Sequence, residues 1–87
     1  MRIWGKMMKG NHMLKDMTVT DYSSETRTHK IFGALERICH EWDLSVPIWL
    51  DSNVREFKRM KKVRFYQDSF VGEEISFDYL ELLVLEE

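Results

Sequence analysis

Ile75-Ser76-Phe77-Asp78-Tyr79-Leu80-Glu81-Leu82-Leu83-Val84-Leu85 carries the clearest structural signal in the chain. In an extended conformation Leu80, Leu82 and Val84 point to one side, and the odd-numbered apolar residues point to the other. A strand that is apolar on both faces is normally covered on both faces. The segment therefore predicts a strand over residues 75–86, with a helix over residues 79–86 as the alternative, although that helix has no convincing cap.

Residues 63–70 are rich in strand-forming side chains, so we expect them to pair with this segment around a turn at residues 71–74. At the other end of the chain, residues 2–9 and 12–21 predict a hairpin around Gly10-Asn11. Its simplest pairing places Met8 opposite Met13, Lys6 opposite Lys15 and Trp4 opposite Met17. Two lysines face each other unfavourably in this register, so a bulge could shift it.

Two helices are expected between the hairpins. Apolar residues recur at helical spacing within residues 24–43, and Ser23 or Ser24 suits the N-cap. A shorter helix follows the helix-starting residues 51–53 and should end near Lys62. Pro47 makes residues 44–50 a buried connection or a short edge strand. Residues 1–87 thus predict a single α+β domain of order ββααββ, with a four-stranded, mainly antiparallel sheet and two helices.

Composition narrows the function classes. The chain has 87 residues, a net charge of −2 and one cysteine, Cys39, so an internal disulfide cannot form and a cytoplasmic location follows by default. No run is apolar enough to span a membrane. We find no glycine-rich phosphate loop, and His40-Glu41-Trp42-Asp43-Leu44 lacks the second histidine of the zinc-peptidase motif. We therefore expect no enzyme activity and no cofactor.

Four stretches resemble short uncharacterised bacterial proteins of similar length: residues 28–32, 47–51, 67–70 and 77–81. The resemblance covers most of the chain. It implies a bacterial, stand-alone, intracellular protein, and it carries no activity to this sequence.

Charge is divided along the chain. Residues 55–64 carry one acid and six basic groups, whereas residues 65–87 carry seven acids and no lysine or arginine. The basic residues are Arg55, Lys58, Arg59, Lys61, Lys62 and Arg64. Followed by aromatic side chains, they could bind nucleic acid, although the acidic end of the chain and the pI near 5.9 argue against it.

Apolar side chains on both faces of the terminal strands favour association instead. Two helices can cover one face of a four-stranded sheet, which leaves the second face exposed. We expect that face, or the apolar edge of the sheet, to bind another copy or a partner protein, through Trp4, Met8, Met13, Met17, Leu80, Leu82 and Val84. The sequence thus indicates a non-enzymatic interaction or regulatory module that forms a homodimer; the alternative is a nucleic-acid-associated accessory protein.

Overall fold

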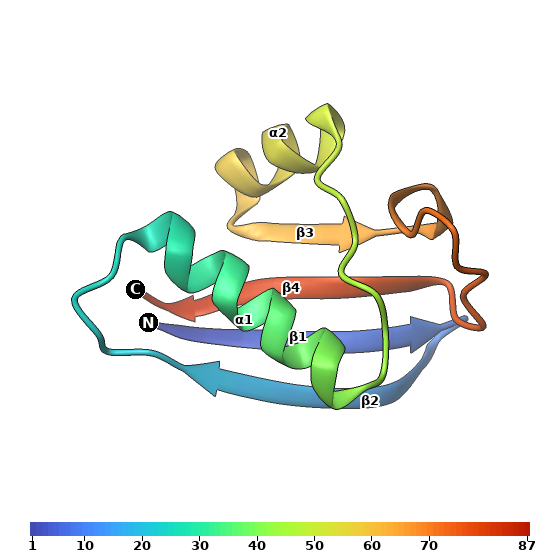
Figure 1. Cartoon of the computed structure of the whole chain (residues 1–87), viewed down its shortest axis with the longest axis horizontal. Coiled ribbons are helices and arrows are strands. Elements are labelled where there is room, and N and C mark those ends of the chain that lie inside the picture. The colour runs from blue at the N-terminus through green and yellow to red at the C-terminus, as the bar shows by residue number, and fades with distance from the viewer.

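A computed structural model describes all 87 residues. It contains strands β1 (Arg2–Lys9) and β2 (His12–Thr20), helices α1 (Arg27–Glu41) and α2 (Asp51–Met60), then strands β3 (Lys62–Phe65) and β4 (Tyr79–Glu86). The four strands form one antiparallel sheet in the order β2-β1-β4-β3 (Figure 1). The predicted α+β class is confirmed. The predicted order differs in one detail, because a short 3-10 helix, η1 (Gln67–Ser69), stands between β3 and β4.

Strand β4 lies in the middle of the sheet, between β1 and β3, which confirms the strand over the helix for residues 79–86. Its side chains alternate as predicted. Leu80, Leu82 and Val84 face the helices and are buried, whereas Tyr79 and Leu83 face the other side and are half-buried. Central strands bury both of their hydrogen-bonding edges, so a long apolar segment suits this position.

The predicted extension of the last two strands over residues 66–70 and 75–78 is wrong, although the chain does turn at Val71 and Gly72. Strand β3 ends at Phe65, and residues 66–78 form a connection rather than a continuation of the two strands. Phe70 and Phe77 anchor this connection in the core, where their rings meet edge to face with centroids 5.8 Å apart. Burial of these two rings stabilises the fold more than further pairing of β3 with β4 would, because longer strands would place alternate side chains in solvent.

The first hairpin contains a bulge, as the unfavourable pairing of Lys6 with Lys15 indicated. Met8 pairs with Met13 as predicted, but the register shifts between Met7 and Met8. Lys6 therefore lies opposite Asp16 instead of Lys15, and Trp4 lies opposite Thr18 instead of Met17. The shift replaces a like-charge pair by an opposite-charge pair across the strands.

Helix α1 begins later than the sequence indicated. Thr26, not Ser23 or Ser24, is the N-cap, and its Oγ1 accepts a hydrogen bond from the backbone N–H of His29. The helix then lies against β1 at Gly5. A β-carbon at Gly5 would come within 2.6 Å of Ile38 Cδ1, so the missing side chain permits this close approach.

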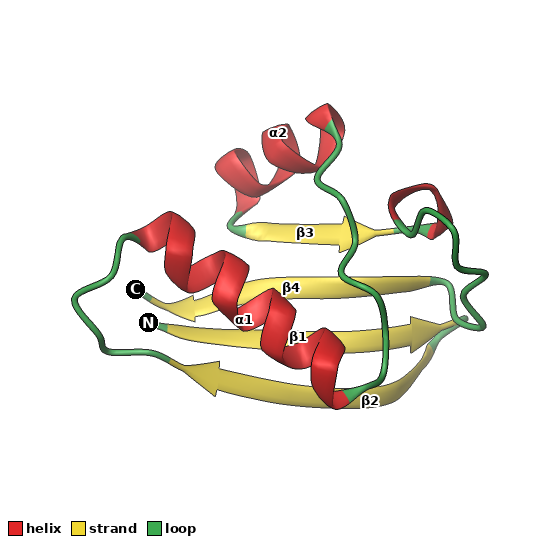
Figure 2. Cartoon of the chain, in the orientation of Figure 1, coloured by secondary structure: helices red, strands yellow, loops and turns green.

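Helix α1 crosses one face of the sheet and α2 lies beside the edge strand β3, and both contribute side chains to one core (Figure 2). Between them and the strands lies a core of 17 buried residues that includes Ile3, Ile38, Phe65 and Leu82. Trp49, from the connection before α2, contacts the rings of Phe57 and Phe65 edge to face. The opposite face of the sheet has no helix over it, and it is called the open face below.

Candidate functional site

The open face is built from the side chains of β1 and β4 that point away from the helices. Trp4, Lys6 and Met8 on β1 lie opposite Leu83, Glu81 and Tyr79 on β4. Trp4, Met8, Tyr79 and Leu83 are half-buried although no element covers them. Met13 of β2 lies beside Met8 and is 48% exposed. These apolar groups form two patches, Trp4 with Leu83 and Met8 with Met13 and Tyr79, and the charged row of Lys6 and Glu81 lies between them.

The structure divides the residues that the sequence proposed for interaction. Trp4, Met8 and Met13 do lie on the open face. Met17 does not, because the bulge places it opposite Gly5 and against the core. The expectation that Leu80, Leu82 and Val84 form part of an exposed surface is wrong, since all three lie in the core beneath the helices.

Glu81 holds two cations at the centre of the open face. Its Oε1 lies 2.8 Å from Arg64 Nε, and its Oε2 lies 2.8 Å from Lys6 Nζ. Only 5% of its side chain is exposed. Burial raises the pKa of Glu81, but the hydrogen bonds from Lys6 and Arg64 outweigh burial and hold the pKa below its ordinary value. The carboxylate therefore stays ionised at neutral pH.

Aromatic rings flank this ion triad of Lys6, Glu81 and Arg64. Lys6 Nζ lies 4.2 Å from the centroid of the Trp4 ring, and the Arg64 guanidinium lies 4.6 Å from that of Tyr79. The Trp4 indole N–H also donates a 2.9 Å hydrogen bond to Asp16. The contacts hold both long cationic side chains flat on the sheet, so the charges and rings form one ordered surface.

Sequence reasoning missed the triad. Lys6, Arg64 and Glu81 are far apart along the chain and meet only because β1 and β3 both pair with β4. One local signal pointed to it: Glu81 is a single charged residue between Leu80 and Leu82 in an apolar strand. A buried carboxylate in such a position requires a cationic partner.

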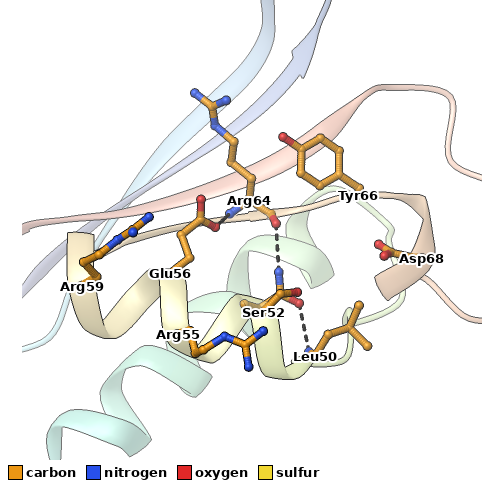
Figure 3. Close-up of a pocket in the computed structure, with 9 residues that line it drawn as sticks. Leu50, Ser52, Arg55, Glu56, Arg59, Arg64, Tyr66 and Asp68 are labelled. Carbon is orange, nitrogen blue, oxygen red and sulfur yellow. Dashed lines mark hydrogen bonds between the residues drawn. The ribbon is translucent and has the colours of Figure 1, made fainter.

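A second feature is a hollow of about 530 Å³ between α2 and β3 (Figure 3). Arg55 and Arg59, one helical turn apart, line it from α2, and Tyr66 lines it from the end of β3. Neither arginine has an acidic partner within 4 Å, and Tyr66 is 48% exposed. Glu56 and Asp68 also line the hollow, so the charges around it are mixed.

Arg64 borders this hollow through its backbone. Its N–H donates to Glu56, and its carbonyl accepts from Asn53, as the dashed lines in Figure 3 show. Its guanidinium points away to Glu81. Asn53 also accepts a hydrogen bond from the backbone N–H of Leu50, so one buried amide connects the start of α2 to β3.

The six basic residues of segment 55–64 do not form one patch. Arg64 is paired with Glu81, and Lys61 lies 3.6 Å from Glu87, so the acidic end of the chain neutralises two of them. Lys58 lies on the side of α2 that faces α1, and Lys62 is opposite Leu83 at the edge of the sheet. Only Arg55 and Arg59 share a hollow without an acidic partner.

Other reactive groups do not converge. Cys39 is fully buried, and burial, with a smaller contribution from Glu73, raises its pKa to about 12. No three histidine, cysteine or carboxylate side chains lie close enough together to hold a metal ion. The helices are too short and too polar to cross a bilayer.

No family model, curated protein or solved structure matches this chain. The resemblance to short bacterial proteins therefore remains an expectation. The geometry of the open face and of the α2–β3 hollow carries the functional argument.

Proposed function

We propose that this chain is a non-enzymatic interaction module that forms a homodimer through the open face of its sheet. One observation carries the proposal: two apolar patches, Trp4 with Leu83 and Met8 with Tyr79, flank the ion triad on a face that no helix covers. Tryptophan, tyrosine, methionine and arginine are the residues enriched at protein interfaces.

The ion triad lowers the desolvation cost of burying this face. A partner that covers an unpaired charge must overcome its full desolvation cost, which amounts to several kcal/mol. Here Glu81 is already desolvated and hydrogen-bonded to Lys6 and Arg64 within the chain. The added cost of covering the triad is correspondingly smaller.

A second copy fits this face because its charges are of both signs. Lys6 and Arg64 are cationic, whereas Asp16 and Glu81 are anionic, so two copies related by a two-fold axis meet without net repulsion. An isologous interface must be complementary to itself in this way. Two sheets that pack face to face also form a common architecture, with a layer spacing of about 10 Å.

The edge of the sheet suits pairing less well. Strand β2 forms the edge beside β1, and the bulge at its start interrupts the regular ladder. A two-fold antiparallel pairing centred on Lys15 or Asp16 would place like charges opposite each other. Bulges and charged residues are how proteins protect exposed edges from pairing.

The size of the face predicts a weak dimer. Four strands of at most eight or nine residues make a surface of roughly 26 by 14 Å. The area of this surface, roughly 360 Å², is below the roughly 800 Å² that each partner buries in stable interfaces. We therefore expect dissociation constants of about 10 μM to 1 mM, in the range of transient contacts.

Sedimentation velocity from about 10 μM to about 1 mM tests the proposal. We expect the average mass to rise with concentration for the native chain. Leu83→Thr removes half of the Trp4–Leu83 patch and should weaken association about fivefold or more, while Val71→Thr, at a 72% exposed loop residue, should change nothing. A native chain that remains monomeric at about 1 mM would refute the homodimer.

A second candidate function is favoured by one observation, the unpaired arginines beside Tyr66. Arg55 and Arg59 could contact successive phosphates of a single-stranded nucleic acid while a base stacks on Tyr66. The measurement is the anisotropy of a fluorescein-labelled oligothymidine at about 50 mM salt. Binding that the double change Arg55→Glu and Arg59→Glu abolishes supports it, and no binding at this salt concentration removes it.

A further inference from the structure

The helical side of the molecule, opposite the open face, carries an apolar groove between α1 and α2. Ile31 and Phe32 of α1, Val54 and Phe57 of α2, and Trp49 enclose a hollow of about 200 Å³. Ile31 and Phe57 are buried, whereas Phe32 is 48% and Val54 36% exposed. The walls of the groove are thus apolar side chains that still face solvent.

A second hollow, of about 240 Å³, adjoins the first. Phe32 and Trp49 line both hollows, and their rings lie with centroids 5.8 Å apart. Leu35 and Val46 complete the second hollow, and Val46 is 49% exposed. Ile31 lines the first hollow and Leu35 the second, one turn apart on α1, so the hollows are separated by about 6 Å along the helix.

The size of the hollows limits the ligand. Pockets for drug-sized molecules measure about 300–1,000 Å³, so each hollow suits a single apolar side chain. Apolar residues at positions i and i+4 of a helix lie about 6 Å apart on one face, which matches the separation of the hollows. Recognition of an amphipathic helix by a groove relies on such anchors.

The charges at the two ends of the groove differ in sign. Arg27 and Lys58 border the first hollow, and Lys58 has no acidic partner within 4 Å. Arg27 already binds a carboxylate, because its guanidinium donates to both oxygens of Glu87 at 2.9 and 3.2 Å. Glu36 borders the second hollow and has no cationic partner. A ligand that is acidic at one end and basic at the other complements this arrangement.

We propose that the α1–α2 groove binds an amphipathic helix of a partner protein, with two apolar anchors one turn apart, an acidic end beside Lys58 and a basic end beside Glu36. This site is independent of the homodimer proposed for the open face. The chain would then connect two copies of a partner when it dimerises.

The test uses a fluorescein-labelled peptide, EEALEAALKAAKK, whose leucines are one turn apart. We expect the full chain to bind it with a dissociation constant below about 1 mM and to bind a version with serine at both leucines at least fivefold more weakly. Val54→Glu should weaken binding of the first peptide by about fivefold or more. Val71→Glu, at a loop residue outside the groove, is the matched control.

Charge reversal provides the second measurement, and it does not depend on the folding of Val54→Glu. Lys58→Glu should lower affinity for the peptide by about 3- to 10-fold and raise affinity for KKALKAALEAAEE, in which the charges are exchanged. Backbone amide shifts on titration should centre on Phe32 and Val54. Absence of binding at about 1 mM, or equal binding of the leucine and serine peptides, overturns the proposal. Leu83→Thr should leave peptide binding unchanged, which separates this site from the dimer.

Discussion

Arg64 and Glu81 lie directly opposite each other on β3 and β4, with Arg64 Nε 2.8 Å from Glu81 Oε1. Lys6 occupies the equivalent position on the other side of Glu81, in β1. One carboxylate therefore links three of the four strands on the face that no helix covers. On this face the triad helps to fix the three strands relative to one another, as packed side chains do beneath the helices.

Glu81→Gln should lower the free energy of unfolding by about 1–3 kcal/mol. Removal of the charge leaves Lys6 and Arg64 facing each other without a counter-charge, but both remain partly hydrated, which limits the cost. Urea unfolding at pH 7 measures the change. Glu86→Gln is the matched control, since Glu86 lies 4.0 Å from Arg2 in an exposed pair and should cost less than about 0.5 kcal/mol. Equal losses in the two variants would contradict a structural role for the triad.

The triad also predicts how stability depends on pH. Because the pKa of Glu81 is lower in the folded chain than its ordinary value of 4.5, its contribution is complete above about pH 4.5 and is lost as the pH falls through the folded pKa. The free energy of unfolding should change little between about pH 7 and 5 and then fall below about pH 4.5. The free energy of unfolding of Glu81→Gln should fall less steeply, because this variant lacks the Glu81 carboxylate. It should still fall, because Asp21 and Glu87, whose pKa values are also lowered, titrate in both proteins. Parallel pH profiles would show that Glu81 is not the titrating group.

Gly5→Ala should destabilise the protein by about 1–3 kcal/mol, because the new β-carbon would meet Ile38 Cδ1 at 2.6 Å and force this fully buried side chain to shift within the packed core. Gly33→Ala is the matched comparison within α1. No atom lies within 4 Å of a β-carbon there, so alanine should stabilise the helix by about 0.5–1 kcal/mol. Thermal unfolding of the two variants should shift in opposite directions. A neutral Gly5→Ala would indicate that the Ile38 side chain moves without cost.

Alanine substitution of two neighbouring leucines on β4 should affect stability and self-association differently. Leu82→Ala removes a fully buried side chain and should lower the free energy of unfolding by about 2–5 kcal/mol. Leu83→Ala, on the open face, should cost less than about half as much and instead weaken self-association. Urea unfolding and sedimentation velocity, run on both variants, separate the two effects. Similar stability losses would place the two side chains in equally packed surroundings.

Cys39 should resist thiol reagents in the folded protein. Its side chain is fully buried, and burial raises its pKa to about 12, so very little thiolate forms at pH 8. Labelling with iodoacetamide should be slow in buffer and fast in about 6 M urea, where the chain unfolds. Mass spectrometry over time measures both rates. Fast labelling under native conditions would show that α1 opens locally.

Patterns of neighbouring residues predicted much of the fold. Alternation along residues 79–86 identified β4, and helical spacing identified α1, because both signals depend on side chains close together in the chain. The sequence also predicted the first hairpin and its bulge, since the simplest pairing would place Lys6 opposite Lys15. The ends of elements were less accurate: capping by Thr26 rather than Ser23 or Ser24 depends on the path of the backbone before α1.

The local sequence was enough to establish that β4 has two apolar faces, because strand geometry sends alternate side chains to opposite sides. It could not establish which face the helices would cover, so it predicts Leu80, Leu82 and Val84 on a surface, whereas they belong to the core. That choice depends on contacts between segments far apart in sequence. The same contacts bring Lys6 and Arg64 to Glu81, and chain folding alone makes these three residues neighbours.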